Sequence, residues 1–120
     1  MHADSEEIAL LAANGVGVAH CPRSNGYLGC GVAPVEELLA AGVAVSIATD
    51  SPASTPSLDL FEEIRSAIVG GRARGGRPDA FSAARALELA TLGGARVLGL
   101  DDRIGSLVPG KQADLTVISL

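Results

Sequence analysis

VAVSIATDS, residues 43–51, is a short run of apolar and β-branched side chains that ends abruptly in Thr49, Asp50 and Ser51. A strand that is apolar on both faces is typical of a parallel sheet that is buried on both sides. Because α/β folds collect their chemistry at the carboxyl ends of such strands, Asp50 is a candidate site residue. The spacing is also compatible with an Asp that caps the turn or helix that follows. Taken by itself, the spacing favours this capping role.

The composition indicates a globular chain of one domain, or a piece of a larger one. Of its 120 residues 48% are hydrophobic and 19% are charged, and the net charge of −5 argues against nucleic-acid or anionic-membrane partners. No apolar run approaches the length of a membrane span, and no signal peptide is recognised. Cys21 and Cys30 fit neither a disulfide framework nor a zinc pattern, so we expect thiols in a reducing cytoplasm.

Helical and extended patterns alternate along the first half of the chain. Asp4 with Glu7 resembles a capping box, and Asn14-Gly15 is a stop signal. In order, we expect a helix over 4–14, a strand over 16–20, a loop over 21–33, a helix over 34–42 that opens on Pro34, a strand over 43–48 and a loop to residue 57. Two parallel strands leave both sheet edges open, which indicates part of a larger structure.

The second half is mostly helical and then changes character. Residues 58–69 predict an amphipathic helix, with Leu58, Phe61, Ile64 and Ile68 on one face and Glu62, Glu63 and Arg65 on another. Beyond it we expect a linker over 70–78, a helix capped by Ser82 through Leu92, a shorter helix over 94–98 that ends at Gly99, short β segments around 104–111 and a strand over 115–120.

Both predicted strands end in a polar residue, His20 in the first and Asp50 in the second. If the strands are parallel neighbours, these ends lie on the same rim, where a His and an Asp form a minimal acid–base or metal-ligand pair. Pro22 and Ser24 predict a rigid loop at that rim. The loop has no Lys-Ser/Thr ending, so a phosphate site is not supported. The pair alone is a weak signal, because two residues do not close a metal shell.

Four motifs, in order and over essentially the whole chain, resemble those of the amidohydrolase superfamily, in the branch of the methylthioadenosine, S-adenosylhomocysteine and guanine-type deaminases and the triazine hydrolases. The motifs are His20-Cys21-Pro22-x-Ser24-Asn25, Gly31-x-Ala33-Pro34, Thr49-Asp50-Ser51 and Ile104-Gly105-Ser106-Leu107-x-x-Gly110-Lys111-x-Ala113-Asp114-Leu115.

The resemblance implies an α/β fold, the carboxyl-terminal part of a metal-dependent (β/α)₈ barrel with one zinc or iron ion at the strand ends. Residues 1–100 would supply about the last two barrel strands and their helices, and residues 101–120 would return to a small flanking β-sandwich. By the same resemblance Asp50 is a metal ligand and takes a proton from the attacking water. His20 and Ser51 would lie in the substrate pocket.

The chain departs from the family pattern in its missing ligands. The family's metal shell also needs a His-x-His pair, a further metal-binding His, a catalytic His and a nearby Glu, and none has a counterpart here. His2 fits the place of a second His three residues beyond the catalytic one. We therefore expect a portion of an enzyme that hydrolyses a C–N bond of a heteroaromatic or nucleoside-like substrate, inactive alone and binding no metal tightly.

Two alternatives follow from the same residues. The first is a small non-catalytic α/β module that binds a partner or self-associates, as a homo-oligomer, through the exposed half-barrel face. In another arrangement, the missing ligands come from a complementing amino-terminal segment on a separate chain. The preferred substrate stays open, because loops of the earlier strands set it in this family.

Overall fold

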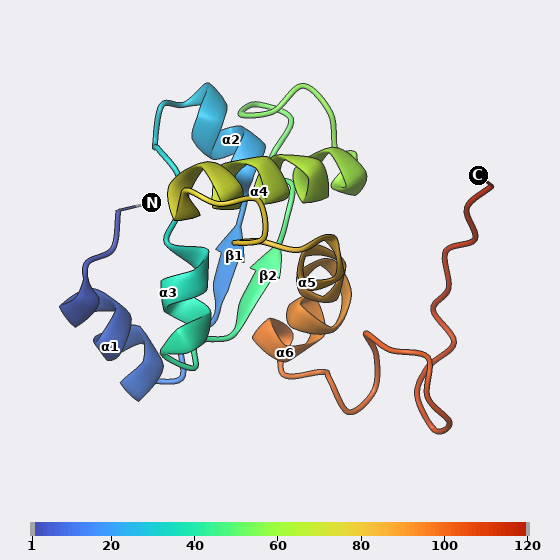
Figure 1. The fold of residues 1–120 in the computed structure, drawn as a ribbon. Coiled ribbons are helices and arrows are strands. Elements are labelled where there is room, and N and C mark those ends of the chain that lie inside the picture. Colours follow the sequence, from blue (N-terminus) through green and yellow to red (C-terminus); the bar gives the residue numbers. More distant parts are fainter. Residues whose placement is uncertain (1, 120) are drawn as a thin grey trace.

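The computed structural model describes residues 2–119 and centres on two short strands with helices packed around them (Figure 1). The strands lie side by side near the middle, with α3 beside β1, α4 across their upper end and α5 and α6 beside β2. The elements, in chain order, are α1 (Ser5–Ala13), β1 (Val18–His20), α2 (Pro22–Tyr27), α3 (Val35–Ala40), β2 (Val45–Ile47), α4 (Leu60–Gly75), α5 (Ala83–Glu88), the π-helix η1 (Leu89–Gly93) and α6 (Gly94–Leu98).

The two strands are parallel, as their apolar pattern predicted. Val18 pairs with Val45 and His20 pairs with Ile47. Flanking backbone hydrogen bonds, from Val18 N to the Ala44 oxygen at 2.8 Å and from Ala48 N to the His20 oxygen at 2.9 Å, extend the ladder at both ends. Parallel pairing puts the carboxyl ends of β1 and β2 at the same edge of the sheet.

The core lies between the strands and the helices that cover them. Its buried members are apolar side chains from β2, from α1, α3, α4, α5 and η1 and from the loops beside them, with one aromatic ring, and Val18 of β1 packs against them. They include Ile8, Leu38, Val45, Ile47, Ala67, Phe81, Ala86 and Leu89. Leu38 and Phe81 are at most 1% exposed. Small side chains allow the helices to pack closely on the strands.

The first helix follows its local signals closely. Asp4 accepts hydrogen bonds from the Glu6 and Glu7 amides, and the Glu7 side chain accepts one from the Asp4 amide, so the predicted capping box is confirmed. The helix ends at Ala13, with Gly15 at φ 62° just beyond it. Pro34 is the N-cap of α3 and the helix begins at Val35, one residue later than predicted.

Two predictions in the middle of the chain were wrong. Residues 22–27, predicted as loop, form α2, because Pro22 at the first helical position fixes φ and has no amide proton to leave unpaired. The predicted linker over 70–78 belongs largely to α4, which begins after its cap Asp59 and continues to Gly75. Its glycines serve packing: a Cβ on Gly71 would come within 2.8 Å of Phe81.

Residues 83–98 form one continuous helical path with a π segment in the middle. Ser82 Oγ accepts a hydrogen bond from the Arg85 amide at 3.1 Å, as its predicted capping role requires. Gly99 adopts the left-handed conformation, at φ 68°, and ends α6 where predicted. The π turn η1 was not predicted.

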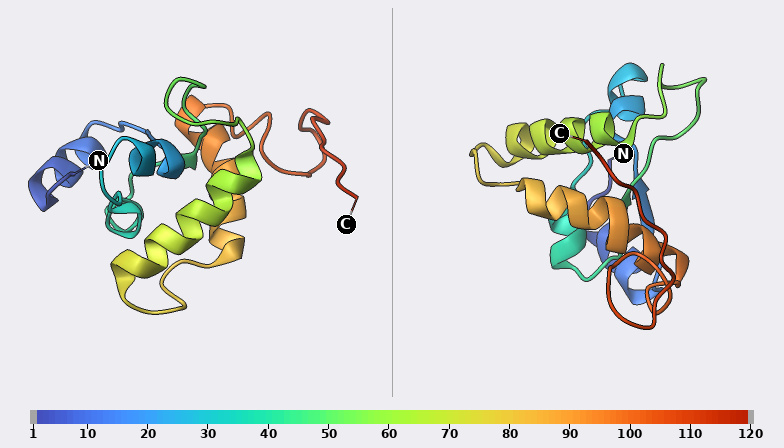
Figure 2. Two further views of the ribbon diagram at one scale, coloured as in Figure 1. Left: turned by 90° about the horizontal axis from the view of Figure 1, so that it is seen from above. Right: turned by 90° about the vertical axis from the view of Figure 1, so that its right-hand side faces the viewer.

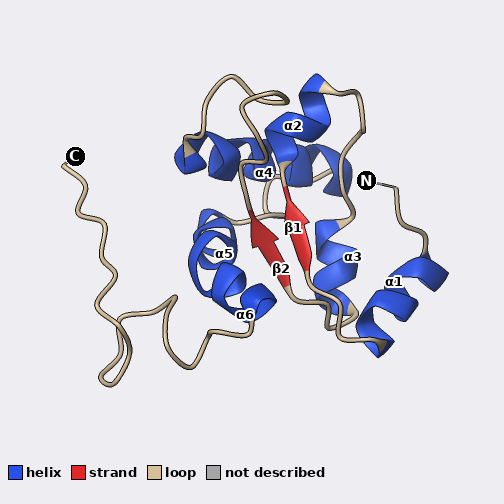
Figure 3. Ribbon diagram, turned by 180° about the vertical axis from the view of Figure 1, so that it is seen from behind, coloured by secondary structure: helices blue, strands red, loops and turns tan. Residues whose placement is uncertain are grey.

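Residues 101–119 contain turns and no strand. The turn at Gly105 lies against Ala95 of α6, and the rest of the segment runs away from the helices as a loop (Figures 2 and 3). The β segments predicted around 104–111 and over 115–119 are therefore absent, and Leu120 lies outside the described residues. A strand needs a hydrogen-bonding partner, and none of the segments described here pairs with this one. Lys111 Nζ instead ties the turns together, donating to the Asp101 carbonyl and, at 2.8 Å, to Ser106 Oγ.

Candidate functional site

Asp50 lies three residues beyond the end of β2, at the edge where both strands finish. It is exposed, and among the described residues it is the one non-glycine residue with a positive φ, 61°. Asp tolerates this left-handed conformation better than most residues. The turn here brings the Asp50 carboxylate to α2 on one side and to the following loop on the other.

Two serine hydroxyls hold the Asp50 carboxylate. Ser24 Oγ, from α2, donates to Oδ2 at 2.6 Å, and Ser54 Oγ, from the loop after β2, donates to the same oxygen at 2.7 Å. These hydrogen bonds favour the charged form and lower the pKa of Asp50 below its ordinary value. Asp50 is therefore an ionised, oriented carboxylate at neutral pH, which suits a metal ligand.

The capping alternative for Asp50 receives little support from the geometry. The helix that follows β2 is α4, and its cap is Asp59, whose carboxylate accepts from the Phe61 amide at 2.8 Å. Asp50 does contribute to the turn over 51–55 through its bond with Ser54. The carboxylate thus reaches beyond its own turn to α2.

Ser51 forms the turn itself. Its carbonyl oxygen accepts from the Ser54 and Thr55 amides at 3.0 and 3.1 Å, and its hydroxyl accepts from the Ala53 amide at 3.3 Å. Ser51 is exposed beside Asp50. Its place in the substrate pocket stays a prediction.

His20 lies on the strand face that packs against the helices. It shares that face with Val18, which contacts the core, while Ala19 between them points to the other face and is exposed. The side chain of His20 is only 5% exposed, and its Nδ1 has no hydrogen-bond partner among the described residues. Burial lowers the pKa of His20 to about 4, so the ring is neutral at pH 7.

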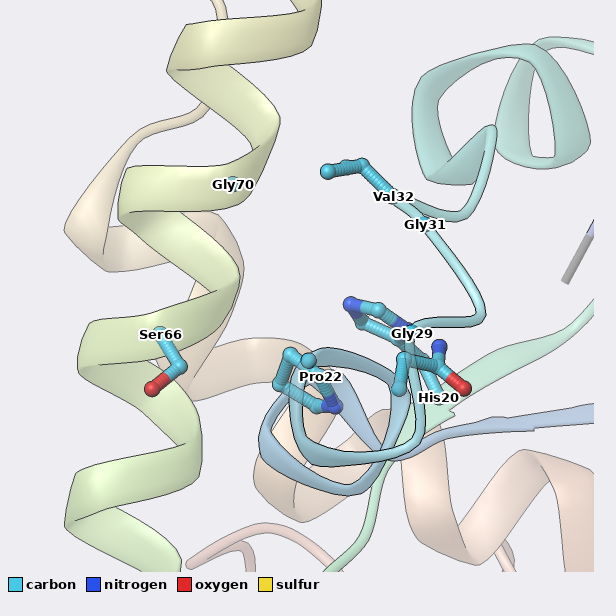
Figure 4. A pocket seen from close by; sticks show the side chains of 9 residues that line it. His20, Pro22, Gly29, Gly31, Val32, Ser66 and Gly70 are labelled. Atoms are coloured by element: carbon cyan, nitrogen blue, oxygen red, sulfur yellow. The ribbon is translucent and has the colours of Figure 1, made fainter.

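The His20 ring borders a cavity of about 350 Å³ that lies between α2, the 29–32 loop and α4 (Figure 4). The remaining lining residues are Pro22, Asn25, Gly26, Gly29, Gly31, Val32, Ser66 and Gly70. Asp50 and Ser51 do not line it. The structure thus brings the ends of the two strands together but gives the His20 and Asp50 side chains different surroundings.

The donor set around Asp50 fits one corner of a metal site. No group of three or more His, Cys, Asp or Glu side chains within residues 2–119 is arranged to hold a metal ion. A zinc site takes about four ligands, and an ionised carboxylate is one of the usual kinds. Asp50 is one such carboxylate, and the other ligands do not come from the part of the chain that the structure describes.

Sequence reasoning missed the residues that hold Asp50. Ser24 was placed in a rigid loop, but it lies in α2 and donates to Asp50. Glu63 was placed on the polar face of its helix, yet it is 0% exposed. One signal for the contact between Ser24 and Asp50 was available in the sequence. The Pro22-x-Ser24 segment and the serine-rich stretch after Asp50 each follow one of the two parallel strands, so both segments lie at the same edge of the sheet.

Within residues 2–119, no helix is both long enough and apolar enough to cross a bilayer.

The chain is similar to several known proteins. It is 50% identical over 120 residues to a 5-methylthioadenosine/S-adenosylhomocysteine deaminase of Moorella thermoacetica. The aligned region covers all of this chain and 28% of that protein. Among solved structures, it resembles a zinc-bound adenosine deaminase from Xanthomonas campestris, at TM-score 0.89 and 47% identity over 94% of this chain and 26% of that one. It also resembles the E. coli guanine deaminase, at TM-score 0.84 and 36% identity over 93% and 25%.

The chain spans about a quarter of the length of these relatives and corresponds to their carboxyl-terminal part. The amidohydrolase family pattern matches residues 1–120, the whole length of this chain. This match includes the strand end that carries Asp50 and the segment that carries His20 and Ser24. The chain therefore belongs to the amidohydrolase family.

Proposed function

We propose that this chain is the carboxyl-terminal part of a metal-dependent deaminase that hydrolyses a C–N bond of a heteroaromatic or nucleoside-like substrate. The observation that carries the proposal is Asp50, an ionised carboxylate held by two hydroxyls at the end of a parallel strand. It occurs in a chain half identical to a deaminase.

We assign β1 and β2 to the last two strands of a (β/α)₈ barrel, with residues 1–100 in the barrel and residues 101–120 returning to a small β-sandwich. Parallel pairing and helices on the strands support the barrel assignment. The loop conformation of 101–119 supports a segment that pairs with strands supplied by another part of the protein.

Asp50 would hold the metal through its carboxylate, together with ligands from the earlier strands. A divalent cation, zinc or alternatively iron, lowers the pKa of a water bound to it toward neutrality. The Asp50 carboxylate would also accept the proton of that water, and its two serine partners would keep the ligand oriented. Asp50 is thus both the metal-binding and the catalytic residue of this chain.

We further propose that Ser51 and His20 lie along the substrate side of the site. Ser51 is exposed next to Asp50, which supports direct contact with a small heterocyclic substrate. His20 contributes a neutral ring at the edge of a cavity, and its Nδ1 has no hydrogen-bond partner among the residues that the structure describes. We place the enzyme in the cytoplasm, because Cys21 and Cys30 do not follow the spacing of a disulfide framework and a reducing compartment suits them.

A chimeric enzyme tests this function. The matching carboxyl-terminal quarter of the Moorella deaminase is replaced by this chain, and ammonia release is measured from methylthioadenosine, S-adenosylhomocysteine and other aminated heterocycles. We expect a folded, zinc-containing enzyme that releases ammonia, and an Asp50→Asn chimera that folds but does not. A folded chimera that holds zinc and yet deaminates none of these compounds would refute the proposal.

The alternative of a self-associating module is tested with the 120-residue chain by itself. Exposed apolar side chains, including Tyr27 and Leu28 at the end of α2, favour some partner for this surface. Sedimentation equilibrium over a range of concentrations measures self-association. A stable dimer without metal, together with an inactive chimera, would favour the module over the enzyme portion.

A further inference from the structure

Glu63 is a buried carboxylate that the proposed chemistry does not use. It lies in the first turn of α4 and is 0% exposed. Burying a charge is expensive unless partners compensate it. The partners of Glu63 therefore indicate why the chain keeps a carboxylate at this place.

The partner of Glu63 is Arg23, in the first turn of α2. The Arg23 backbone amide donates to Glu63 Oε2 at 3.1 Å, and the Arg23 guanidinium lies 3.9 Å from Oε1. The same guanidinium donates to Ser57 Oγ at 2.9 Å. Because Oε1 accepts no hydrogen bond among the described residues, the pair is incompletely satisfied. Such pairs contribute little net stability over an apolar replacement, which favours a role in positioning.

The residue next to Arg23 in α2 is Ser24, which donates to Asp50. Glu63 fixes the backbone of α2 at Arg23, and the buried Ser24 hydroxyl then sits 2.6 Å from Asp50 Oδ2. Ser54 approaches the same oxygen from the other side. A continuous set of contacts thus runs from the interior of α4, through α2, to the exposed carboxylate.

We propose that Glu63, Arg23, Ser24 and Ser54 are positioning residues that orient Asp50 toward the metal. The two hydroxyls both donate to Oδ2, so Oδ1 would be the oxygen left for the cation. Glu63 acts at a distance by holding α2, and with it the Ser24 hydroxyl, in place. The inference rests on the proposed function for its link to the metal, but the orientation of Asp50 can be measured without it.

The orientation is tested first in the 120-residue chain without metal. The ¹³Cγ resonance of Asp50 is compared in Ser24→Ala, Glu63→Gln and Glu62→Gln variants at neutral pH. Glu62 is the matched control, because it neighbours Glu63 on the same helix and its carboxylate forms an exposed ion pair with Arg65 at 2.9 Å. We expect the first two variants to shift the resonance and the third to leave it unchanged. Equal spectra for Glu63→Gln and the wild type would overturn the role of Glu63.

The consequence for the metal is tested in the chimeric enzyme. We expect Ser24→Ala and Ser54→Ala together to raise the zinc dissociation constant by about 10–100-fold, as loss of ligand-supporting hydrogen bonds does elsewhere. Glu63→Gln should raise the zinc dissociation constant less. Ser24→Thr, which keeps the hydroxyl, should give the wild-type value, and Glu62→Gln should not change it. The visible spectrum of the cobalt-substituted enzyme should change in the same order. A folded double serine variant with unchanged zinc affinity and cobalt spectrum would refute the proposal.

The resonance experiment and the zinc experiment together separate this inference from the proposed function. If the chimera neither binds zinc nor deaminates while the Asp50 resonance still responds to Glu63→Gln, the function fails and the positioning contacts stand. If the chimera is active but neither experiment responds to the serine variants, the function stands and the positioning role is wrong.

Discussion

Two adjacent glycines at the start of α6 should respond oppositely to the same substitution. Gly93 and Gly94 both have helical backbone angles, with φ near −59°. A Cβ on Gly93 would lie 2.5 Å from the carbonyl oxygen of Val45 in β2, whereas a Cβ on Gly94 would meet nothing within 4 Å. Gly93→Ala therefore probes how closely the helix packs on the strand that leads to Asp50.

The expected magnitudes follow from helix propensity and packing. Ala is better than Gly in a helix by about 1 kcal/mol, so Gly94→Ala should stabilise the chain by about that amount. Gly93→Ala has the same gain, but overpacking costs about 1–3 kcal/mol, and we expect the upper end, about 3 kcal/mol, because a backbone atom cannot move aside as a side chain can. We expect a net loss of about 2 kcal/mol, hence a difference of about 3 kcal/mol between the variants.

Urea denaturation followed by circular dichroism measures this difference, and thermal melts provide a second estimate. With an unfolding entropy of about 2.1 cal/mol/K per residue, the variants should differ in Tm by about 12 °C. Gly94→Ala is the matched control for helix propensity. If Gly93→Ala is as stable as Gly94→Ala, the helix does not rest against the Val45 carbonyl and the packing described here is wrong.

Three further predictions concern buried groups. Burial lowers the pKa of His20 to about 4, so the unfolded chain binds the extra proton between that value and about 6.5. The free energy of unfolding should therefore fall by up to about 3 kcal/mol as the pH drops through this window. Urea titrations at several pH values should show this slope in the wild type, and a His20→Gln variant with the same slope would contradict it. Burial also raises the pKa of the Cys21 thiol, so in a Cys30→Ser background iodoacetamide should alkylate it more slowly in the folded than in the urea-unfolded chain, as followed by mass spectrometry. Equal rates would contradict this. Leu38→Ala should destabilise the chain by about 2–5 kcal/mol in urea, because Leu38 is fully buried. The control Leu10→Ala, at a side chain that is 63% exposed, should change stability little, and equal effects would place the core elsewhere.

The parts of the fold that depend on local signals were predictable from the sequence. The capping box at Asp4 and the cap at Ser82 act within four residues, so they can be recognised without a structure. The parallel strands followed from two apolar runs separated by a helix. The length of α4 was not predictable, because Gly71 is retained for its contact with Phe81 and nothing near it in sequence shows that.

The position of the candidate site was predictable, but its geometry was not. Asp50 stands out because a polar residue ends an apolar strand. Its partner Ser24 is 26 positions away and lies in a segment predicted as loop, so their contact depends on how α2 packs. Glu63 was predicted on the polar face of its helix, together with its charged neighbours. It is buried instead and contacts Arg23, 40 positions away, which the helical pattern does not indicate.

The strand after residue 114 was predicted from composition and is absent from 115–119 for a different reason. Its apolar side chains are suited to a sheet, and Val117 is 94% exposed. A single strand cannot satisfy its own backbone groups, so it forms only when another strand pairs with it. The prediction therefore depends on a partner that sequence patterns in this segment cannot supply.

The contacts around Asp50 divide the proposed metal site into two parts with different requirements. The left-handed backbone at Asp50 and the two hydroxyls on Oδ2 all come from residues 22–54, so the orientation of this ligand is built within the chain. The remaining ligands must be supplied by other residues, and one carboxylate binds zinc weakly however well it is oriented. Zinc affinity of the chain by itself is thus a poor measure of how well Asp50 is prepared. In the chimeric enzyme, by contrast, the other ligands are constant, and any change in zinc affinity among the serine variants reports the orientation of Asp50.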